Sequence, residues 1–232
     1  MYYILSKIIT VFLFYISIAV FILGVVTKLA KWYIKPRNIA SYTLYPKSNI
    51  LPVMLRISLF SRIFEVDRFL WASAWILHIS LILLFFGHLR LFQEPYWLWS
   101  ITGLKTGEDI SRFALISGGT TGVLFLASIL ILLARRFGNT LSKLSVFEDY
   151  FILLLLILIG ITGNYMRFMM HINVSELQQF FISLLYLNPL PHPNNPVFLA
   201  HMFLAELLLM YLPFSKLIHS ISTIILTYRL AR

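Results

Sequence analysis

The sequence predicts an all-α integral membrane protein, a bundle of five transmembrane helices in a single domain over residues 1–232. Hydrophobic residues make up 59% of the chain and charged residues only 12%, whereas a soluble domain is about half apolar and about a quarter charged. An apolar helix of about 20 residues crosses the hydrocarbon core of a bilayer. Five stretches of this kind are present, at residues 4–30, 68–92, 112–133, 147–169 and 197–226.

The first stretch is predicted to be a membrane span and not a cleavable signal. It is long, it has no small-residue cleavage site, and its basic cluster follows it. The basic residues of this cluster are Lys28, Lys31, Lys35 and Arg37. Because basic residues concentrate in cytoplasmic loops, we expect the N-terminus outside and the C-terminus in the cytoplasm.

The segments between the first and third spans are predicted to lie at the membrane surfaces. Residues 31–67 form a basic inner loop whose later part, MLRISLFSRIFEVD, has the pattern of an amphipathic helix at the interface. The second span then runs from inside to outside. Residues 93–111 form an outer loop in which Trp97 and Trp99 are expected to anchor the membrane interface.

The third and fourth spans are rich in glycine, which lets helices or a flat ring approach closely. These glycines are Gly118, Gly119 and Gly122 in the third span and Gly160 and Gly163 in the fourth. An outer loop over residues 170–196 follows, with a short helix expected near residues 176–186. The fifth span completes the bundle.

The distribution of basic residues supports this topology. Only five of the 19 lie on the outer side, namely Lys7, Arg90, Lys105, Arg112 and Arg167. The other 14 gather at the inner ends of the spans, as expected for a multi-pass protein of the cytoplasmic membrane. This basic inner face is suited to an acidic partner protein.

Two of the five spans carry histidines at membrane depth, His78 and His88 in the second and His201 and His219 in the fifth. An ionisable group in the membrane interior is costly and indicates function. The two helices run antiparallel, so His78 would face His219 and His88 would face His201. Each pair can hold one iron porphyrin, which predicts two haem b groups. Iron with two axial histidines carries electrons and has no open position.

The histidine spacings differ between the two helices. His201 and His219 are 18 residues apart, five turns along one face, or about 27 Å of rise. His78 and His88 are ten residues apart, or about 15 Å. The mismatch requires a tilt or a bend, which Pro213 can supply. The alternative interpretation is that the four histidines are polar packing residues between helices.

These features resemble the membrane cytochrome b family that includes the nitrate reductase gamma subunit. The matching stretches are HISLILLFFGH, SGGTTGVL, ARR and YLPFSKLIH. That family has five spans, with haem ligands on the second and fifth. The stretch LFSRIFEVDRFLWASAWILH is more similar to the branch that serves heterodisulfide reductase and the sulfite reductase-associated Dsr complex.

The resemblance implies an electron-transfer subunit of a respiratory oxidoreductase complex, active in anaerobic respiration. It would pass electrons between menaquinol or a similar quinone near the outer face and a cytoplasmic iron–sulfur subunit of heterodisulfide-reductase type. The direction could be reversed in a complex that reduces quinone. Two alternatives remain open: a ferric-reductase or hydrogenase-type cytochrome b, and a haem-free membrane anchor or transporter.

Five further residues are candidates for binding the haem or the quinone. Gly87 leaves room for a ring beside His88, where the resemblance places the quinol site. Arg90 and Lys216 can pair with haem propionates, since a buried carboxylate needs a cation. Lys105 and Arg112 can donate to a quinone oxygen or a propionate, or they are ordinary interfacial charges.

Glu206 is the only carboxylate in the fifth span. It could belong to a proton path, but we expect it to pair with Asn164 or with a hydroxyl group.

Several classes of chemistry are excluded or unsupported. The chain has no cysteine, so it contains no disulfide, no cysteine-ligated iron–sulfur cluster and no cysteine-attached haem. It carries no nucleotide-binding or zinc-protease motif, and its basic residues flank apolar spans, so nucleic-acid binding is not expected. His171 and His192 are expected to be solvated loop residues.

Overall fold

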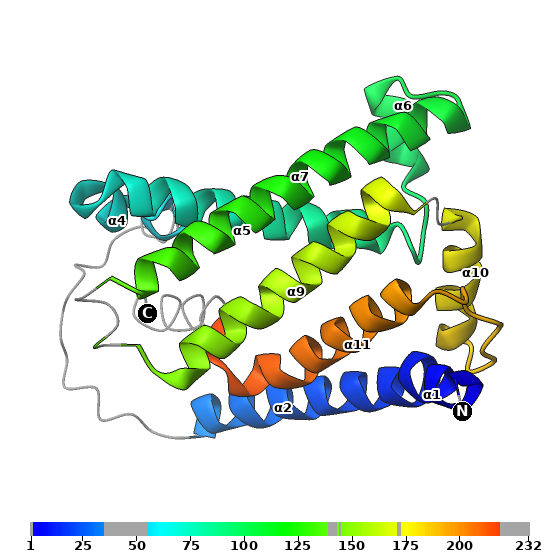
Figure 1. Ribbon diagram of the computed structural model, residues 1–232, viewed down its shortest axis with the longest axis horizontal. Helices are drawn as coiled ribbons and strands as arrows, with labels where there is room; N and C mark the ends of the chain where they lie inside the picture. Colours follow the sequence, from blue (N-terminus) through cyan, green and yellow to red (C-terminus); the bar gives the residue numbers. More distant parts are fainter. Residues whose placement is uncertain (1, 35–54, 139–142, 144, 171–172, 219–232) are drawn as a thin grey trace. The chain divides into compact units, whose positions relative to one another are not determined.

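Every regular element that the structure describes is a helix. The computed structural model describes residues 2–34, 55–138, 143, 145–170 and 173–218. Five helices in these ranges are long and apolar enough to cross a membrane: Tyr3–Lys31, Arg68–Leu89, Gly107–Arg136, Phe147–Met169 and Pro196–Phe214 (Figure 1). They confirm the predicted number of spans. Large apolar side chains on them are exposed, as lipid-facing residues would be, among them Leu23, Phe86 and Ile116.

The chain divides into two compact units. The first comprises Met1–Leu13 and Ser73–Ala205, and the second comprises Phe14–Ala72 and Glu206–Arg232. The first unit contains most of α5 (Arg68–Leu89), all of α7 (Gly107–Arg136) and α9 (Phe147–Met169), and the start of α11 (Pro196–Tyr211). Three of the four membrane-depth histidines belong to it.

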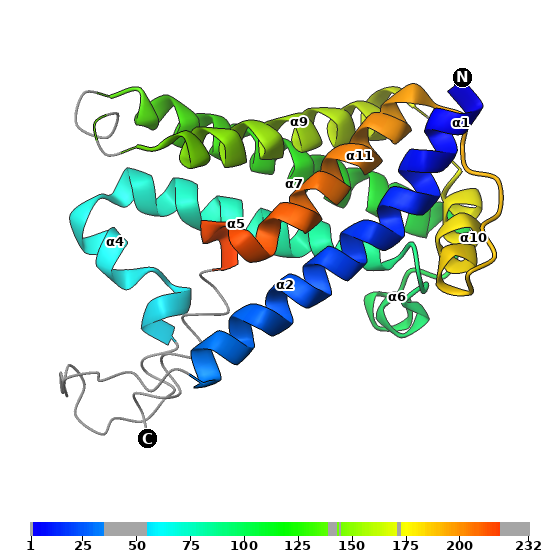
Figure 2. The ribbon, with the colours of Figure 1, turned by 90° about the horizontal axis from the view of Figure 1, so that it is seen from below.

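Within the first unit, α7 and α9 lie side by side and run antiparallel (Figures 1 and 2). Glycines of α7 permit this approach, as predicted. A Cβ atom added to Gly122 would lie 2.2 Å from Asn164 Oδ1, and one added to Gly119 would lie 2.9 Å from Phe168 Cζ. The Asn164 amide also donates to the Gly122 carbonyl at 3.0 Å. Ile129 and Phe125 fill the core beside this contact.

The third span begins five residues earlier than predicted. We expected a start at Arg112, but α7 begins at Gly107. Thr106 caps the helix: its hydroxyl accepts from the Asp109 backbone N–H at 3.1 Å, and the Asp109 carboxylate accepts from Thr106 in return. This reciprocal cap satisfies two backbone donors at once, so the helix continues into the polar segment before the apolar run.

The loops before α7 and before α11 contain short helices, α6 (Tyr96–Thr102) and α10 (Val174–Leu185) (Figure 2). The second confirms the helix expected near residues 176–186. It is amphipathic, and Phe180 and Leu184 on its inner side are fully buried. The side chain of Asn173 caps it by accepting from the Ser175 backbone N–H at 3.0 Å.

The second unit contains α2 (Phe14–Ile34), α4 (Ser61–Val66) and two short 3-10 turns, η2 (Leu212–Phe214) and η3 (Lys216–Ile218). Gly24 of α2 packs against η2, because an added Cβ would lie 2.7 Å from Pro213 Cβ. Lys28 donates to the Pro213 carbonyl at 2.9 Å. The segment expected to form an amphipathic helix is helical at residues 55–58 and in α4. Phe60, at φ 50°, separates these two pieces.

The fifth span is interrupted, which corrects the expected continuous helix over residues 197–226. The α-helix ends at Tyr211, and Ser215 adopts an extended conformation after η2. Proline has no backbone N–H and its ring clashes with the carbonyl four residues earlier, so Pro213 stops the helix and does not merely bend it. The five-turn alignment of His201 with His219 assumed a continuous helix, and it stays a prediction. His219 itself lies outside the described residues.

Candidate functional site

His88 near the end of α5 and His201 in α11 lie opposite each other within the first unit. Their ring centroids are 6.3 Å apart, and the ring planes differ by 11°. Imidazole nitrogens bind metals at about 2 Å, so two axial histidines on one iron hold their ring centres about 6 Å apart. The observed separation fits a porphyrin iron between the two rings.

The hydrogen bonds of the rings leave the correct nitrogen available. His88 Nδ1 lies 2.7 Å from the Leu84 carbonyl, and His78 Nδ1 lies 2.7 Å from the Ala74 carbonyl. A carbonyl oxygen can only accept, so each Nδ1 carries the proton. In this tautomer Nε2 carries the lone pair that can bind a metal, the usual state of a ligating histidine.

In His201 the hydrogen-bond partner of Nδ1 comes from a neighbouring helix, α9. Its Nδ1 lies 2.9 Å from the Thr162 hydroxyl oxygen on α9. That hydroxyl donates to the Leu158 carbonyl at 2.8 Å, so its oxygen is left to accept the His201 Nδ1 proton. The next residue, Gly163, provides space: an added Cβ would lie 3.2 Å from His201 Cε1. Helix α9 therefore fixes both the tautomer and the position of this ring.

The donor set suits a porphyrin iron better than a free ion. Among the described residues, no group of three or more His, Cys, Asp or Glu side chains could hold a metal ion. A porphyrin supplies four nitrogens of its own, so the protein needs to provide only two axial ligands. Gly87 also fits, because an added Cβ there would meet nothing within 4 Å.

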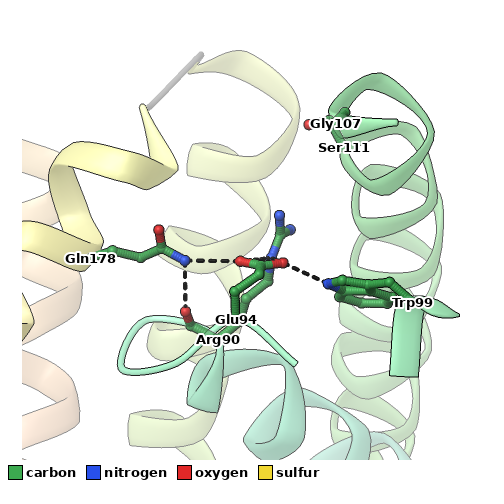
Figure 3. A network of polar contacts seen from close by, with 6 residues as sticks. All are labelled: Arg90, Glu94, Trp99, Gly107, Ser111 and Gln178. Atoms are coloured by element: carbon green, nitrogen blue, oxygen red, sulfur yellow. Dashed lines mark hydrogen bonds and ion pairs between the residues drawn. The ribbon is translucent and has the colours of Figure 1, made fainter. Parts of the chain in front are cut away.

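Arg90, two residues after His88, belongs to a polar network. Its Nε donates to both oxygens of Glu94, at 2.7 and 2.9 Å. Glu94 also accepts from Trp99 Nε1 at 2.8 Å and from the Gln178 amide at 2.9 Å. Figure 3 shows the carboxylate at the centre of these donors, with the terminal nitrogens of Arg90 turned away from it. The network ties the end of α5 to α6 and α10.

Trp99 is therefore not an interface anchor, which corrects the prediction. Its side chain is 7% exposed, and the Arg90 guanidinium lies over its ring at 5.8 Å. Trp97 is 68% exposed, as expected for a residue at the membrane interface. Buried tryptophan needs a partner for its N–H, and Glu94 provides one.

Arg167 is a second cation at this site, and sequence reasoning did not single it out. It lies one helical turn beyond Gly163 on α9, and its Nη2 would be 2.9 Å from a Cβ added to Gly118. Its positive charge is repelled electrostatically by that of Arg90. The glycines of the third span indicated a close approach, but nothing in the sequence indicated that an arginine fills it.

The three other basic candidates are exposed side chains. Arg112 is held by Glu108 at 2.7 Å in a pair whose side chains are 74% and 73% exposed. Lys105 is exposed just before the cap of α7, and Lys216 is exposed in η3. His192 Nδ1 donates to the Pro193 carbonyl at 3.0 Å, and the ring packs edge-on against Phe180, so this residue is not simply solvated. His171 lies outside the described residues.

The Thr162 contact yields a testable prediction. Replacing Thr162 with valine keeps the shape and removes the acceptor for His201 Nδ1. We expect haem affinity to fall about 10-fold to 100-fold, the usual effect of losing such a partner. Titration of haem into the apo-protein measures it. Thr162→Ser retains the hydroxyl and should bind as wild type; equal binding by all three proteins would contradict the role of Thr162.

The fold and this site together define a membrane protein with apolar spans and a histidine pair that fits an axially ligated iron. The sequence pattern of the nitrate reductase gamma subunit family matches residues 57–231, and the chain belongs to that family. A named relative is the Hdr-like menaquinol oxidoreductase cytochrome b-like subunit of Archaeoglobus fulgidus, 28% identical over 89% of this chain and 74% of the relative.

A protein of the same name from Archaeoglobus profundus is 28% identical over 66% of this chain. The alignment covers only 47% of that relative, so the chain spans about half of its length. The relatives support a cytochrome b membrane subunit, as the resemblance implied.

Proposed function

We propose that this chain is a di-haem cytochrome b, the membrane electron-transfer subunit of a respiratory oxidoreductase complex. The observation that carries this proposal is the His88–His201 pair, with ring centroids 6.3 Å apart and both Nδ1 atoms occupied. A haem bound there supplies one-electron oxidation and reduction. His88 and His201 hold it, Thr162 and Gly163 position His201, and Gly87 leaves space for a ring.

A second haem is proposed between His78 and His219. The ring of His78 has its Nδ1 engaged by its own helix, as that of His88 has, which supports a ligating role. The order of the histidines along antiparallel helices assigns His219 as its partner. Lys216, three residues before His219, is proposed as a cation for a propionate of this haem.

The substrate side is proposed to be a quinol, menaquinol or a similar quinone. Support comes from the names of the two relatives, which are menaquinol oxidoreductase subunits. We place the quinol near His88, where Gly87 leaves open space. Arg90 and Arg167 are proposed to donate hydrogen bonds to an oxygen of the quinone or quinol. Lys105 and Arg112 remain candidate donors at the outer end of α7.

The partner is proposed to be a cytoplasmic iron–sulfur subunit of heterodisulfide-reductase type, in the cytoplasmic membrane of the cell. The basic residues that gather at the inner ends of the spans support a docking face there. The same distribution supports an outer N-terminus and a cytoplasmic C-terminus. The chain then carries electrons from the outer side of the bilayer to the inner side, while quinol protons are released outside.

The test of this function is the haem content of the purified protein. A pyridine haemochrome assay is expected to give two b haems per chain, with the low-spin spectrum of iron held by two histidines. One haem per chain, or a high-spin spectrum, would contradict the pairing of four histidines. Absence of haem would leave the alternative of a haem-free membrane anchor.

A further inference from the structure

Glu206 is a carboxylate buried inside a membrane-spanning helix without a partner. Its side chain is 4% exposed, and neither carboxylate oxygen has a hydrogen-bond partner among the residues that the structure describes. This corrects the expected pairing, since the Asn164 amide donates to the Gly122 carbonyl instead. By contrast, Glu94 accepts from three side chains, and Asp149 pairs with Arg136 at 3.1 Å.

An ionised carboxylate in this position would be far less stable than a neutral one. Removing an ion from water is costly unless a counter-ion or several donors replace the water. Within the part of the chain that the structure describes, neither Glu206 oxygen has a hydrogen-bond donor. Lys28 of α2 donates to the Pro213 carbonyl, and Lys216 of η3 is exposed. His201 on the same helix is engaged by Thr162. This burial therefore favours the neutral carboxylic acid form of Glu206.

The position of Glu206 along α11 connects it to the proposed haem. It follows His201 by five residues, about 7.5 Å of helical rise and on a different side of the helix. Any influence between the two is then electrostatic and does not require contact. When the iron loses an electron, its site gains one positive charge, and a positive charge in a medium of low dielectric favours the ionised carboxylate.

We propose that Glu206 is a proton-binding site within the membrane whose protonation is linked to the redox state of the iron held by His201. Glu206 is protonated while that iron is reduced. Glu206 would release one proton to water when a haem held by His201 gave up one electron to a one-electron acceptor. The linkage is reciprocal, so protonation of Glu206 favours the reduced iron. This proposal rests on the proposed haem at His201.

The first experiment is infrared spectroscopy of the purified protein at neutral pH. A carbonyl stretch of a protonated carboxylic acid is expected in the wild type and is lost in Glu206→Gln. Glu65→Gln removes an exposed carboxylate of α4 and should leave the band unchanged. If Glu206→Gln does not fold, carbon-13 labelling of glutamate in the wild type should shift the band. Absence of a glutamate acid band overturns the proposal, whether or not haem is present.

The second experiment follows the same band during oxidation and reduction with a one-electron mediator. We expect the band to decrease when the haem is oxidised. We also expect the midpoint potential of that haem to fall with increasing pH, and this dependence to be lost in Glu206→Gln but kept in Glu65→Gln. A band that does not respond to oxidation overturns the linkage. A protein that shows the band but binds no haem contradicts the proposed function instead.

Discussion

Replacing His88 with alanine is expected to lower the haem content from two to one per chain and to abolish reduction of the remaining haem by quinol. The alanine removes one axial ligand, and a single histidine leaves the iron five-coordinate and weakly held. The proposed quinol position lies beside this haem, so electrons would lose their point of entry. Quinol-driven haem reduction and the haem-to-protein ratio measure both effects.

The geometry provides matched controls for this change. His201→Ala should cause the same loss, and the double variant should be no worse than either single variant, because both residues hold one iron. His192→Ala changes a histidine that packs against Phe180 and should leave two haems. His219→Ala should remove the other haem and leave quinol binding intact. Wild-type rates of haem reduction in His88→Ala would place the quinol elsewhere.

The second large effect is expected from Glu94→Ala, which should lower the free energy of unfolding. Glu94 is the common acceptor for Arg90, Trp99 and Gln178. Its removal leaves the Arg90 guanidinium Nε and the Trp99 indole N–H without this acceptor, while the Gln178 amide keeps its hydrogen bond to the Arg90 carbonyl at 2.9 Å. The ion pair is 19% and 15% exposed, so water replaces only part of what is lost. We expect the free energy of unfolding to fall by about 2–3 kcal/mol, which is at the lower end of the usual cost of removing one partner of a buried ion pair.

A second ion pair serves as the control. Arg112 and Glu108 have the same distance of 2.7 Å and the same four-residue spacing, but their side chains are about three-quarters exposed. Glu108→Ala should therefore cost less than about 1 kcal/mol. Thermal unfolding in detergent, followed by circular dichroism, compares the two variants. Equal shifts in melting temperature would mean that the Glu94 network does not hold α5, α6 and α10 together.

The sequence was sufficient to predict features that depend on local composition. The fourth span has the predicted bounds, Phe147–Met169, because acidic residues begin its apolar run and a basic residue lies in its last turn. The pairing of His88 with His201 followed from the antiparallel course of the second and fifth spans. The start of α7 could also have been predicted from the sequence, because Thr106 and Asp109 form a recognisable capping pattern.

Features that depend on contacts between distant segments could not be predicted. Gln178 meets Glu94 across 84 residues, and no local pattern indicates that pairing. Thr162 meets His201 across 39 residues, and Arg167 reaches α7 only because two helices pack closely. Pro213 was recognised as a source of bending, but the sequence did not decide between a bend and the break that the structure has.

The two rings of the proposed haem site differ in how they are oriented, and this difference predicts an order of assembly. His88 is held by a carbonyl four residues earlier in its own helix, so it is ready to ligate as soon as α5 has formed. His201 depends on Thr162 and Gly163 of α9, so it is ready only after two helices that are inserted separately have met. Binding of haem at this site would therefore report that α9 and α11 have associated. A nascent chain halted before α11 would have His88 ready to ligate, while His201 would not yet have been synthesised.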